Sequence, residues 1–292
     1  MEGMHYEGFI IRPPSEADSI LLQVTLGCSH NKCAFCGAYK NKRFTIKDEA
    51  IIDADIDYAS TNFRFARRVF LIDGDALIIP QPKLTRILSR IKEKMPWIQR
   101  VGIYANAKGI LRKTPEELAQ LRELGLQIVY YGLESGDAQT LQEMRKGHSP
   151  EKMIEAGRKI RDAGMKLSVM VILGLAGRDR STEHARATGL ALSAIDPNYV
   201  GVLTLMIHPG TPLAEQVDEG RFDLITPREM LGELREMLFH TNMTRGLFFA
   251  NHASNYLPLR LKMPADKQKA MQLLDSAIAG QTSLKPEWMR GF

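Results

Sequence analysis

The chain has 292 residues, of which 44% are hydrophobic and 25% charged, and 39 basic against 34 acidic residues leave a formal net charge of +5. This composition is that of a folded protein with a large core, and it excludes a disordered chain, a collagen and a disulfide-rich scaffold. No stretch approaches the roughly 20 apolar residues that span a bilayer, so we expect no membrane helix. Neither charge sign forms a long block, which argues against a nucleic-acid surface. The N-terminal residues lack the pattern of a signal peptide, and we expect a cytoplasmic protein.

Short apolar runs alternate with amphipathic stretches along most of the chain. Six runs rich in Val, Ile and Leu are apolar on both faces, which is typical of strands buried in a parallel sheet. They are Ile20–Val24, Val69–Ile72, Val101–Tyr104, Ile128–Gly132, Leu167–Leu173 and Val200–Ile207. Helices are expected between them, among them Glu151–Ala163, Ser181–Ile195 and one that begins at Pro115 after the N-cap Thr114. Six such units predict a parallel α/β fold, either an open sheet or a partial barrel.

The pattern changes after the sixth predicted strand. Pro227–Phe239 and Ala265–Ala279 are predicted to be helices, with a short apolar strand at Gly246–Asn251 between them. No Gly- and Ser-rich linker interrupts the chain. We therefore expect residues 1–213 to form the main fold, and residues 214–292 to form a C-terminal α/β extension that caps it within the same structural unit.

All three cysteines lie in one loop directly after the first predicted strand. Cys28, Cys33 and Cys36 fall within nine residues, among small and polar neighbours. Core packing does not explain three thiols so close together, and an odd number in a cytoplasmic protein is not a disulfide framework. Metal binding is the better interpretation, and two metals compete. Zinc would take His30 as a fourth ligand, whereas an iron–sulfur cluster held by three thiolates would leave one iron open to a small molecule.

The place of this loop favours iron. Loops that follow the strands of a parallel α/β fold lie at the edge where such folds put their active sites. The loop also resembles that of the radical S-adenosylmethionine (SAM) superfamily, in which an aromatic residue precedes the third cysteine, as Phe35 precedes Cys36 here. The usual superfamily spacing is C-x3-C-x2-C, and this chain has C-x4-C-x2-C. The resemblance implies a partial (β/α)6 barrel that holds one [4Fe–4S] cluster through Cys28, Cys33 and Cys36, with SAM on the fourth iron.

The ends of the second and third predicted strands extend the resemblance. Asp73, Gly74 and Asp75 resemble the glycine-rich turn that superfamily members use to bind the methionyl amine of SAM, with Asp73 in place of the first glycine. Gly74 permits close approach of the backbone, and Asp75 stands at the acidic position. Asn106, at the end of the third strand, is a further candidate SAM contact, with a helix cap as its alternative role.

The end of the fourth predicted strand resembles another part of the superfamily's SAM site. Glu134 and Ser135 stand there, and a carboxylate with a hydroxyl suits the ribose hydroxyls of SAM. Ser135 or Asp137 is also expected to cap the helix that follows. Beyond that helix, Lys146 resembles a basic residue that meets the SAM carboxylate, and Arg145 is an equal candidate.

The last two predicted strands end in turns that contain glycine. Leu173 and Gly174 resemble the apolar strand and turn that support adenine. His208 precedes a Pro-Gly-Thr-Pro turn and either meets the substrate or bonds to the turn. The segment Phe248–Asn255 mixes apolar and hydrogen-bonding residues and is the expected substrate-facing part, although core packing is its alternative. His208 and His252 are the candidate catalytic residues.

The resemblance implies an enzyme in which a reduced cluster cleaves SAM to methionine and a 5′-deoxyadenosyl radical, which abstracts hydrogen from a substrate. It also implies oxygen sensitivity and an electron donor such as flavodoxin or ferredoxin, with no nucleic-acid or membrane partner. Because one cluster uses all three cysteines, we expect no second cysteine-ligated cluster. We also expect no cobalamin-binding domain, because the residues before the first predicted strand are too few to form one. A zinc-stabilised binding protein and a cluster-carrying chaperone or assembly factor are the alternatives. The substrate does not follow from the sequence.

Overall fold

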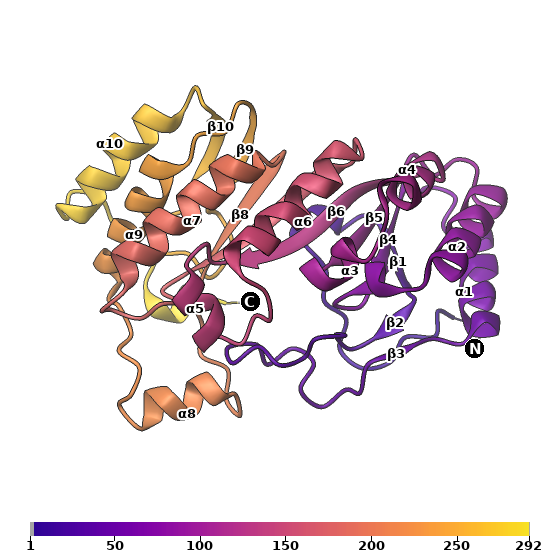
Figure 1. Cartoon of the computed structure of the whole chain (residues 1–292), viewed down its shortest axis with the longest axis horizontal. Helices are drawn as coiled ribbons and strands as arrows, with labels where there is room; N and C mark the ends of the chain where they lie inside the picture. The colour runs from indigo at the N-terminus through magenta and orange to yellow at the C-terminus, as the bar shows by residue number, and fades with distance from the viewer. Residues whose placement is uncertain (1–2, 292) are drawn as a thin grey trace. The chain divides into compact units, whose positions relative to one another are not determined.

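The computed structural model describes residues 3–291 and divides them into two compact units. The first unit is built mainly from the N-terminal half, drawn in indigo to purple in Figure 1, and the second mainly from the C-terminal half, drawn in magenta to yellow. The first contains residues 3–31, 38–131 and 159–167, and the second contains residues 32–37, 132–158 and 168–291. The expected boundary at residue 213 stays an expectation, since the extension shares the second unit with earlier segments.

Four parallel strands of the eight-stranded sheet organise the first unit, in the order β1, β4, β5, β6. The strands are β1 Ile20–Gln23, β4 Arg68–Ile72, β5 Arg100–Ala105 and β6 Leu126–Glu134. The first four predicted strands are thus confirmed, each to within two residues at either end. Phe70 pairs in register with Gly102 of β5, where a Cβ would lie 2.9 Å from the Phe70 ring. The glycine therefore makes room for an aromatic side chain within the sheet.

Helices cover this sheet. They are α1 Glu49–Asn62, α2 Gln81–Lys94, α3 Ala107–Leu111 and α4 Pro115–Glu123, with 3-10 turns at Pro14–Glu16 and Ala76–Ile78. The antiparallel strands β2 Thr25–Leu26 and β3 Thr45–Ile46 form a separate small sheet. Helices α1 and α2 lie side by side, at the right of Figure 1. Helix α4 begins with a capping box between Thr114 and Glu117, as its sequence predicts.

The other four strands of the sheet belong mainly to the second unit, in the order β7, β8, β9, β10. The strands are β7 Lys166–Leu173, β8 Tyr199–Thr204, β9 Gly246–Phe249 and β10 Arg260–Met263. The first three are parallel, and β10, which the sequence did not predict, runs antiparallel to β9. The predicted sixth strand, Val200–Ile207, is too long by three residues. It ends at Thr204, whose N–H donates to Ser254 and whose hydroxyl donates to Asn255. A C-terminal segment therefore occupies the hydrogen-bonding groups of the last residue of β8.

The helices of the second unit are α5 Ala138–Glu143, α6 Pro150–Asp162, α7 Ser181–Ile195, α8 Pro212–Asp218, α9 Pro227–His240 and α10 Lys267–Ile278, with a 3-10 turn at Glu287–Met289. The helices predicted around α6, α7, α9 and α10 are confirmed. Helix α9 lies against both α7 and α10 (Figure 1). The C-terminal residues therefore extend the sheet through β9 and β10 and cover it with α9 and α10.

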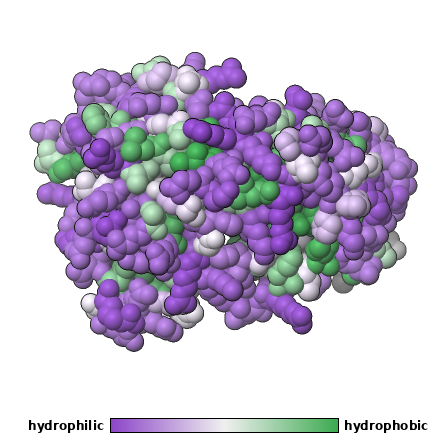
Figure 2. Space-filling view, in the orientation of Figure 1, coloured by the Kyte–Doolittle hydropathy of each residue, from purple (hydrophilic) through white to green (hydrophobic). Residues whose placement is uncertain are grey.

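The visible face of the protein is mostly hydrophilic, with small hydrophobic patches between the polar residues (Figure 2). Single apolar side chains of this kind are normal on folded proteins. Within residues 3–291, no helix has both the length and the hydrophobicity required to cross a bilayer.

Candidate functional site

The first unit gathers a buried polar cluster at the carboxyl ends of β4 and β5. The Asp75 side chain is fully buried, and its Oδ1 accepts the backbone N–H of Asn106 over 3.1 Å. Its Oδ2 accepts the hydroxyl of Ser29, which is also 3.3 Å from the Asn106 amide nitrogen. Asn106 in addition caps α3 by accepting the Gly109 N–H, so its alternative role is realised. Burial raises the pKa of Asp75 to about 6.

Asp73 lies beside this cluster, also fully buried at the end of β4. Its Oδ2 accepts the N–H of Gly27 at 3.1 Å, the amide of Gln23 at 3.2 Å and the ammonium of Lys42 at 3.4 Å. Burial raises the pKa of Asp73 against the lowering effect of these donors. Among the described residues, Oδ1 has no hydrogen-bond partner. A buried acceptor without a partner is costly, so this atom is a natural place for a ligand's donor group.

Gly74 brings the turn after β4 close to the cysteine loop. A Cβ at this position would lie 2.6 Å from the ring of Tyr39 and 3.2 Å from the Cβ of Cys28. Only glycine allows this approach without a shift of the neighbouring side chains. The predicted turn residues and the first predicted cluster ligand therefore meet within the first unit.

The three cysteines are partly buried, so their thiols lie neither in the core nor fully in solvent. Cys28 belongs to the first unit, whereas Cys33 and Cys36 belong to the second. Within residues 3–291, no group of three or more His, Cys, Asp and Glu side chains is gathered as a metal site. The donor set itself, three thiols within nine residues, fits a [4Fe–4S] cluster with one iron left open. The cysteines remain predicted ligands.

The loop after Cys33 is tied to the second unit by its backbone. The N–H of Ala34 donates to the carbonyl of Met144 over 3.0 Å, and the carbonyl of Ala34 accepts the N–H of Leu213 over 3.1 Å. Phe35 packs against an apolar cluster that contains all three of these residues. The aromatic residue of the motif thus anchors the loop in the core, which leaves its predicted contact with the cofactor untested.

Two predicted SAM contacts of the second unit, Glu134 and Lys146, form an ion pair. Glu134 Oε1 is 2.9 Å from Lys146 Nζ, and the side chains are only 14% and 12% exposed. The pair lies over the backbone of Gly132, where a Cβ would be 2.2 Å from Glu134 Oε1. Arg145, the equal candidate, occupies the preceding position with a φ of 52°. A carboxylate and an ammonium therefore stand together just after β6.

Ser135 is fully buried beside this pair. Its Oγ lies 2.8 Å from Nδ1 of His184 and accepts the N–H of Asp137 over 2.9 Å. Asp137, one of the two predicted caps, is the residue that caps α5, by accepting the N–H of Thr140. The hydroxyl of Ser135 is thus engaged with a helix α7 histidine that the sequence did not single out.

The turn after β7 is hydrogen-bonded to a side chain of α9. Leu173 is buried, and its carbonyl accepts the N–H of Leu205 over 2.9 Å. Gly174 has a φ of +79°, and its N–H donates to Glu233 Oε1 over 2.6 Å. Sequence reasoning missed Glu233, although a usable signal existed. This carboxylate interrupts the apolar stripe of an amphipathic helix, beside residues such as Met230.

The two candidate catalytic histidines are both engaged locally. The carbonyl of His208 accepts the hydroxyl of Thr211 over 2.7 Å. Nδ1 of His252 accepts the N–H of Ser254 over 3.2 Å, and burial lowers the pKa of His252, which keeps the ring neutral near pH 7. These contacts build turns, and a catalytic role for either histidine stays a prediction.

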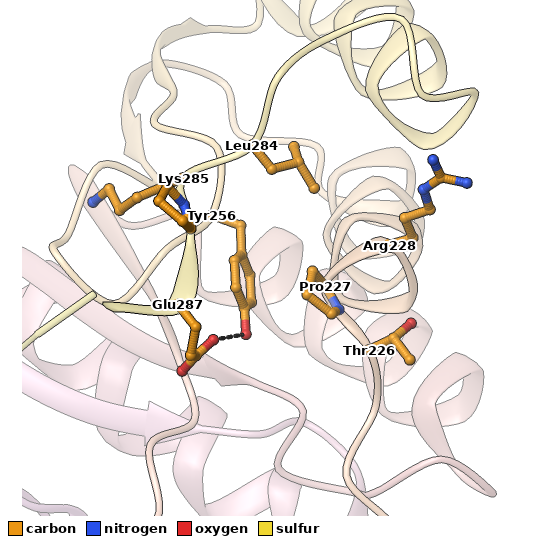
Figure 3. Close-up of a pocket in the computed structure, with 8 residues that line it drawn as sticks. Thr226, Pro227, Arg228, Tyr256, Leu284, Lys285 and Glu287 are labelled. Atoms are coloured by element: carbon orange, nitrogen blue, oxygen red, sulfur yellow. Dashed lines mark hydrogen bonds between the residues drawn. The ribbon is translucent and has the colours of Figure 1, made fainter. Parts of the chain in front are cut away.

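A separate pocket of about 540 Å³ lies in the second unit (Figure 3). It is formed by the start of α9, Tyr256 and the segment 284–287. The hydroxyl of Tyr256 points towards Glu287 and donates a hydrogen bond of 2.7 Å to it. None of the described residues that line the pocket is among the site residues predicted from the sequence.

Residues 22–187, more than half of the chain, match the radical SAM superfamily. This chain belongs to the radical SAM superfamily. The matched span includes the cysteine loop and the strand ends through Gly174, and membership implies a [4Fe–4S] cluster and SAM. The family resemblance inferred from the sequence is thereby confirmed.

The chain is also similar, at low sequence identity, to two characterised proteins. The chain is 22% identical over 167 residues to the heme chaperone HemW of Bacillus subtilis, which covers 56% of this chain and 42% of that protein. It is 27% identical over 231 residues to biotin synthase of Salinispora tropica, and this alignment covers 75% of this chain and 66% of the synthase. The chain thus spans less than two thirds of the length of these relatives.

A solved structure is similar in fold. The radical SAM methyltransferase TsrM of Kitasatospora setae, solved with cobalamin and a [4Fe–4S] cluster, superposes with a TM-score of 0.57 and 18% identity. The match covers 69% of this chain and 39% of TsrM. The likeness shows the fold alone, and it confirms the predicted α/β partial barrel with parallel strands.

Proposed function

We propose that this chain is a radical SAM enzyme that holds one [4Fe–4S] cluster through Cys28, Cys33 and Cys36 and generates a 5′-deoxyadenosyl radical for hydrogen abstraction from a substrate. The superfamily match over the span that contains the three thiols carries this proposal. When bound, the cluster supplies the electron that breaks a carbon–sulfur bond of SAM, which leaves methionine and the radical.

The first unit supplies the binding groups for the methionyl amine of SAM. Asp73 offers a buried oxygen that has no partner among the described residues, and Gly74 lets the backbone approach closely. Asp75 is already bonded to Ser29 and Asn106, so its role is to hold this edge in shape. The amine would complete the hydrogen bonding of Asp73, which supports the assignment.

The second unit supplies groups for the rest of SAM. Lys146 provides the positive charge for the SAM carboxylate, and Glu134 provides acceptors for the ribose hydroxyls. Their ion pair keeps both side chains in place and balances their charges where they are largely removed from water. Leu173 and the backbone of Gly174 support the flat adenine ring.

A reducing partner is part of the proposal. The cluster must be reduced before it can cleave SAM, so we propose an electron donor such as flavodoxin or ferredoxin. The substrate is unidentified, and His208 and His252 stay candidates for contact with it. Exclusion of water and oxygen from the radical is the remaining task of the protein.

A cluster-carrying chaperone is the second candidate function. The similarity to HemW, a heme chaperone by name, is the observation behind it, whereas the superfamily match favours the enzyme. The third possibility, a zinc-stabilised protein with Cys28, Cys33, Cys36 and His30 as ligands, is disfavoured by the superfamily match.

Anaerobic reconstitution tests the proposal. The protein is loaded with iron and sulfide, its iron and sulfide contents are measured, and it is incubated with SAM and dithionite while 5′-deoxyadenosine is followed by mass spectrometry. We expect about four irons per chain and formation of 5′-deoxyadenosine. A colourless protein with one tightly bound zinc would contradict the proposal. A loaded cluster that binds SAM but never cleaves it would support the chaperone function.

A further inference from the structure

Two turns of the second unit are pressed against helices. A Cβ on Gly136, after β6, would lie 2.3 Å from the backbone oxygen of Ala187 in α7. A Cβ on Gly174, after β7, would lie 2.4 Å from Cε of Met230 in α9. Both glycines thus allow a turn at the carboxyl end of a strand to pack directly on a helix.

Hydrogen bonds lock the same two turns to the same two helices. The N–H of Gly136 donates to Thr188 Oγ1 in α7 over 2.9 Å. The N–H of Gly174 donates to Glu233 Oε1 in α9 over 2.6 Å, and the other carboxylate oxygen accepts the hydroxyl of Ser181 at the start of α7. The backbone of each turn is therefore held by a side chain of a buried helix face.

His184 joins the two attachments. Its Nδ1 is 2.8 Å from the Oγ of Ser135, and its Nε2 is 3.1 Å from the carbonyl of Ile172 in β7 and 3.5 Å from Glu233 Oε1. Because Ser135 Oγ also accepts the N–H of Asp137, the bonds are satisfied when Ser135 donates to Nδ1 and Nε2 carries the proton. A continuous network of polar contacts then connects the turn after β6 with α7, α9 and the turn after β7.

Because this hydrogen-bond network is buried, its members resist displacement. The side chains of His184 and Glu233 are 0% exposed, and burial raises the pKa of Glu233. In such surroundings a polar atom that loses its partner is not rescued by water, so every member resists displacement. Glu233 lies outside residues 22–187, so this support comes from beyond the span that matches the superfamily.

We propose that Glu233 and His184 are positioning residues for SAM, which hold the Glu134–Ser135 and Leu173–Gly174 turns in the conformation that receives ribose and adenine. Ser135 then acts through His184 and not by contact with SAM. The inference rests on the proposed function, because only there do these turns bind SAM. It assigns to the C-terminal region a part in SAM binding in addition to any part in substrate binding.

Two readouts test the proposal on the anaerobically reconstituted full chain. One is the dissociation constant for SAM, measured by equilibrium dialysis without reductant, so that no turnover is needed. The other is hydrogen–deuterium exchange at residues 134–137 and 172–177 in the absence of SAM. The variants are Glu233→Ala, Glu233→Gln, Ser135→Ala, His184→Ala and the double variant of the last two.

Ser193→Ala is the matched control. The hydroxyl of Ser193 donates to the carbonyls of Gly189 and His240 over 2.9 and 2.8 Å, and so joins α7 to α9 at the end away from the turns. This variant loses bonds between the same helices, and we expect it to lower the melting temperature while it leaves SAM affinity unchanged.

We expect Glu233→Ala to weaken SAM binding by about tenfold and to speed exchange at residues 172–177, with an unchanged iron content. Glu233→Gln keeps an acceptor for the Gly174 N–H and should stay within about threefold of the wild type. The effects of Ser135→Ala and His184→Ala on SAM affinity should be less than additive in the double variant, because both substitutions remove the same Ser135–His184 bond in addition to the bonds that each residue makes separately.

Unchanged exchange and unchanged SAM affinity in both Glu233→Ala and Ser135→Ala would overturn the proposal. So would fully additive effects of Ser135→Ala and His184→Ala, since Ser135 would then act independently. A wild-type protein with an intact cluster that binds no SAM would overturn the proposed function, and this inference with it. Loss of SAM binding by Glu233→Ala with normal exchange at both turns would point to direct contact and would also contradict positioning.

Discussion

The carboxyl ends of the strands are built in different ways in the two units. In the first unit, the polar residues at the strand ends bond to one another and to the loop after β1, as Asp75 does with Asn106 and Ser29. In the second unit, the corresponding residues bond outwards to helices, as Ser135 does to α7 and Gly174 does to α9. Each edge contains a buried acid whose pKa is raised by burial, Asp75 in the first and Glu233 in the second.

This difference teaches which parts of the chain a SAM site needs. The first edge is assembled from residues within the span that matches the superfamily. The second edge depends on a helix that begins forty residues beyond that span, at Pro227 (227 − 187 = 40). The family match therefore covers the residues proposed to contact SAM more completely than those proposed to hold them in place.

The largest expected effect concerns the cluster that both edges are proposed to serve. Cys33→Ala should abolish the cluster, because two thiolates do not replace three, and its iron content should fall to background. His30→Ala should keep the cluster, with the absorption spectrum of the wild type. Loss of metal in the His30 variant alone would instead favour a zinc site.

The next effect compares one substitution at both edges. Gly136→Ala should lower the free energy of unfolding by about 3 kcal/mol, because the new Cβ meets the helix backbone at Ala187. Gly74→Ala should cost less, about 1 kcal/mol, because the new Cβ meets the side chain of Tyr39 and not backbone. Urea unfolding measures both values, and equal costs would show that the second edge is no more rigid than the first.

The pH dependence of stability tests the buried acid of the first edge. The pKa of Asp75 is about 6 in the folded chain and near the usual 3.8 when unfolded, so the folded chain binds this proton more tightly. Its contribution to stability is therefore fully present below the unfolded value and is lost as the pH rises through about 6. Relative to Asp75→Asn, which stays neutral and keeps acceptor and donor atoms, the wild type should gain stability as the pH falls from about 8 to about 4. Melting temperatures of both proteins that run parallel across this range would contradict the raised pKa.

The smallest expected effect comes from removing the N-cap of one helix in each unit. Thr114→Ala and Thr226→Ala each remove the N-cap of a capping box, in α4 and α9, and each should cost about 1 kcal/mol of stability. Only Thr226→Ala should also weaken SAM binding, because α9 carries Glu233. Thermal unfolding and equilibrium dialysis of the two variants provide the measurement, and equal loss of SAM affinity would remove the distinction between the edges.

Strands β1 and β4 to β9, and helices α4, α6, α7, α9 and α10, were predictable from the sequence because their causes are local. Strands buried on both faces need apolar runs, and α4 and α9 carry their capping residues within one turn of their starts. The end of β8 was not predictable in the same way. The strand ends at Thr204 because this residue bonds to Ser254 and Asn255, about fifty residues later, and residues 205–207 carry no local signal of that ending.

In the candidate site, too, local motifs were predictable from the sequence and contacts between distant residues were not. The cysteine spacing, the Asp73–Asp75 turn and the strand-end residues Glu134 and Gly174 could be named from the sequence, since each is a short motif after an apolar run. The pairings of these residues with one another and with α7 could not. Lys146 pairs with Glu134 across α5, and His184 reaches Ser135 from 49 residues away, so these contacts exist only once the helices pack.

The sequence by itself determined the fold class, the superfamily and the set of thiols, because these rest on periodicity and on residues that are close in the chain. The tertiary structure decided which polar groups stay open to a ligand and which are used to hold the turns. Asp73 keeps one oxygen without a partner among the described residues, whereas Ser135 gives its hydroxyl to His184. The physical reason is that satisfaction of a buried polar atom depends on everything packed around it, and that packing joins residues far apart in the chain.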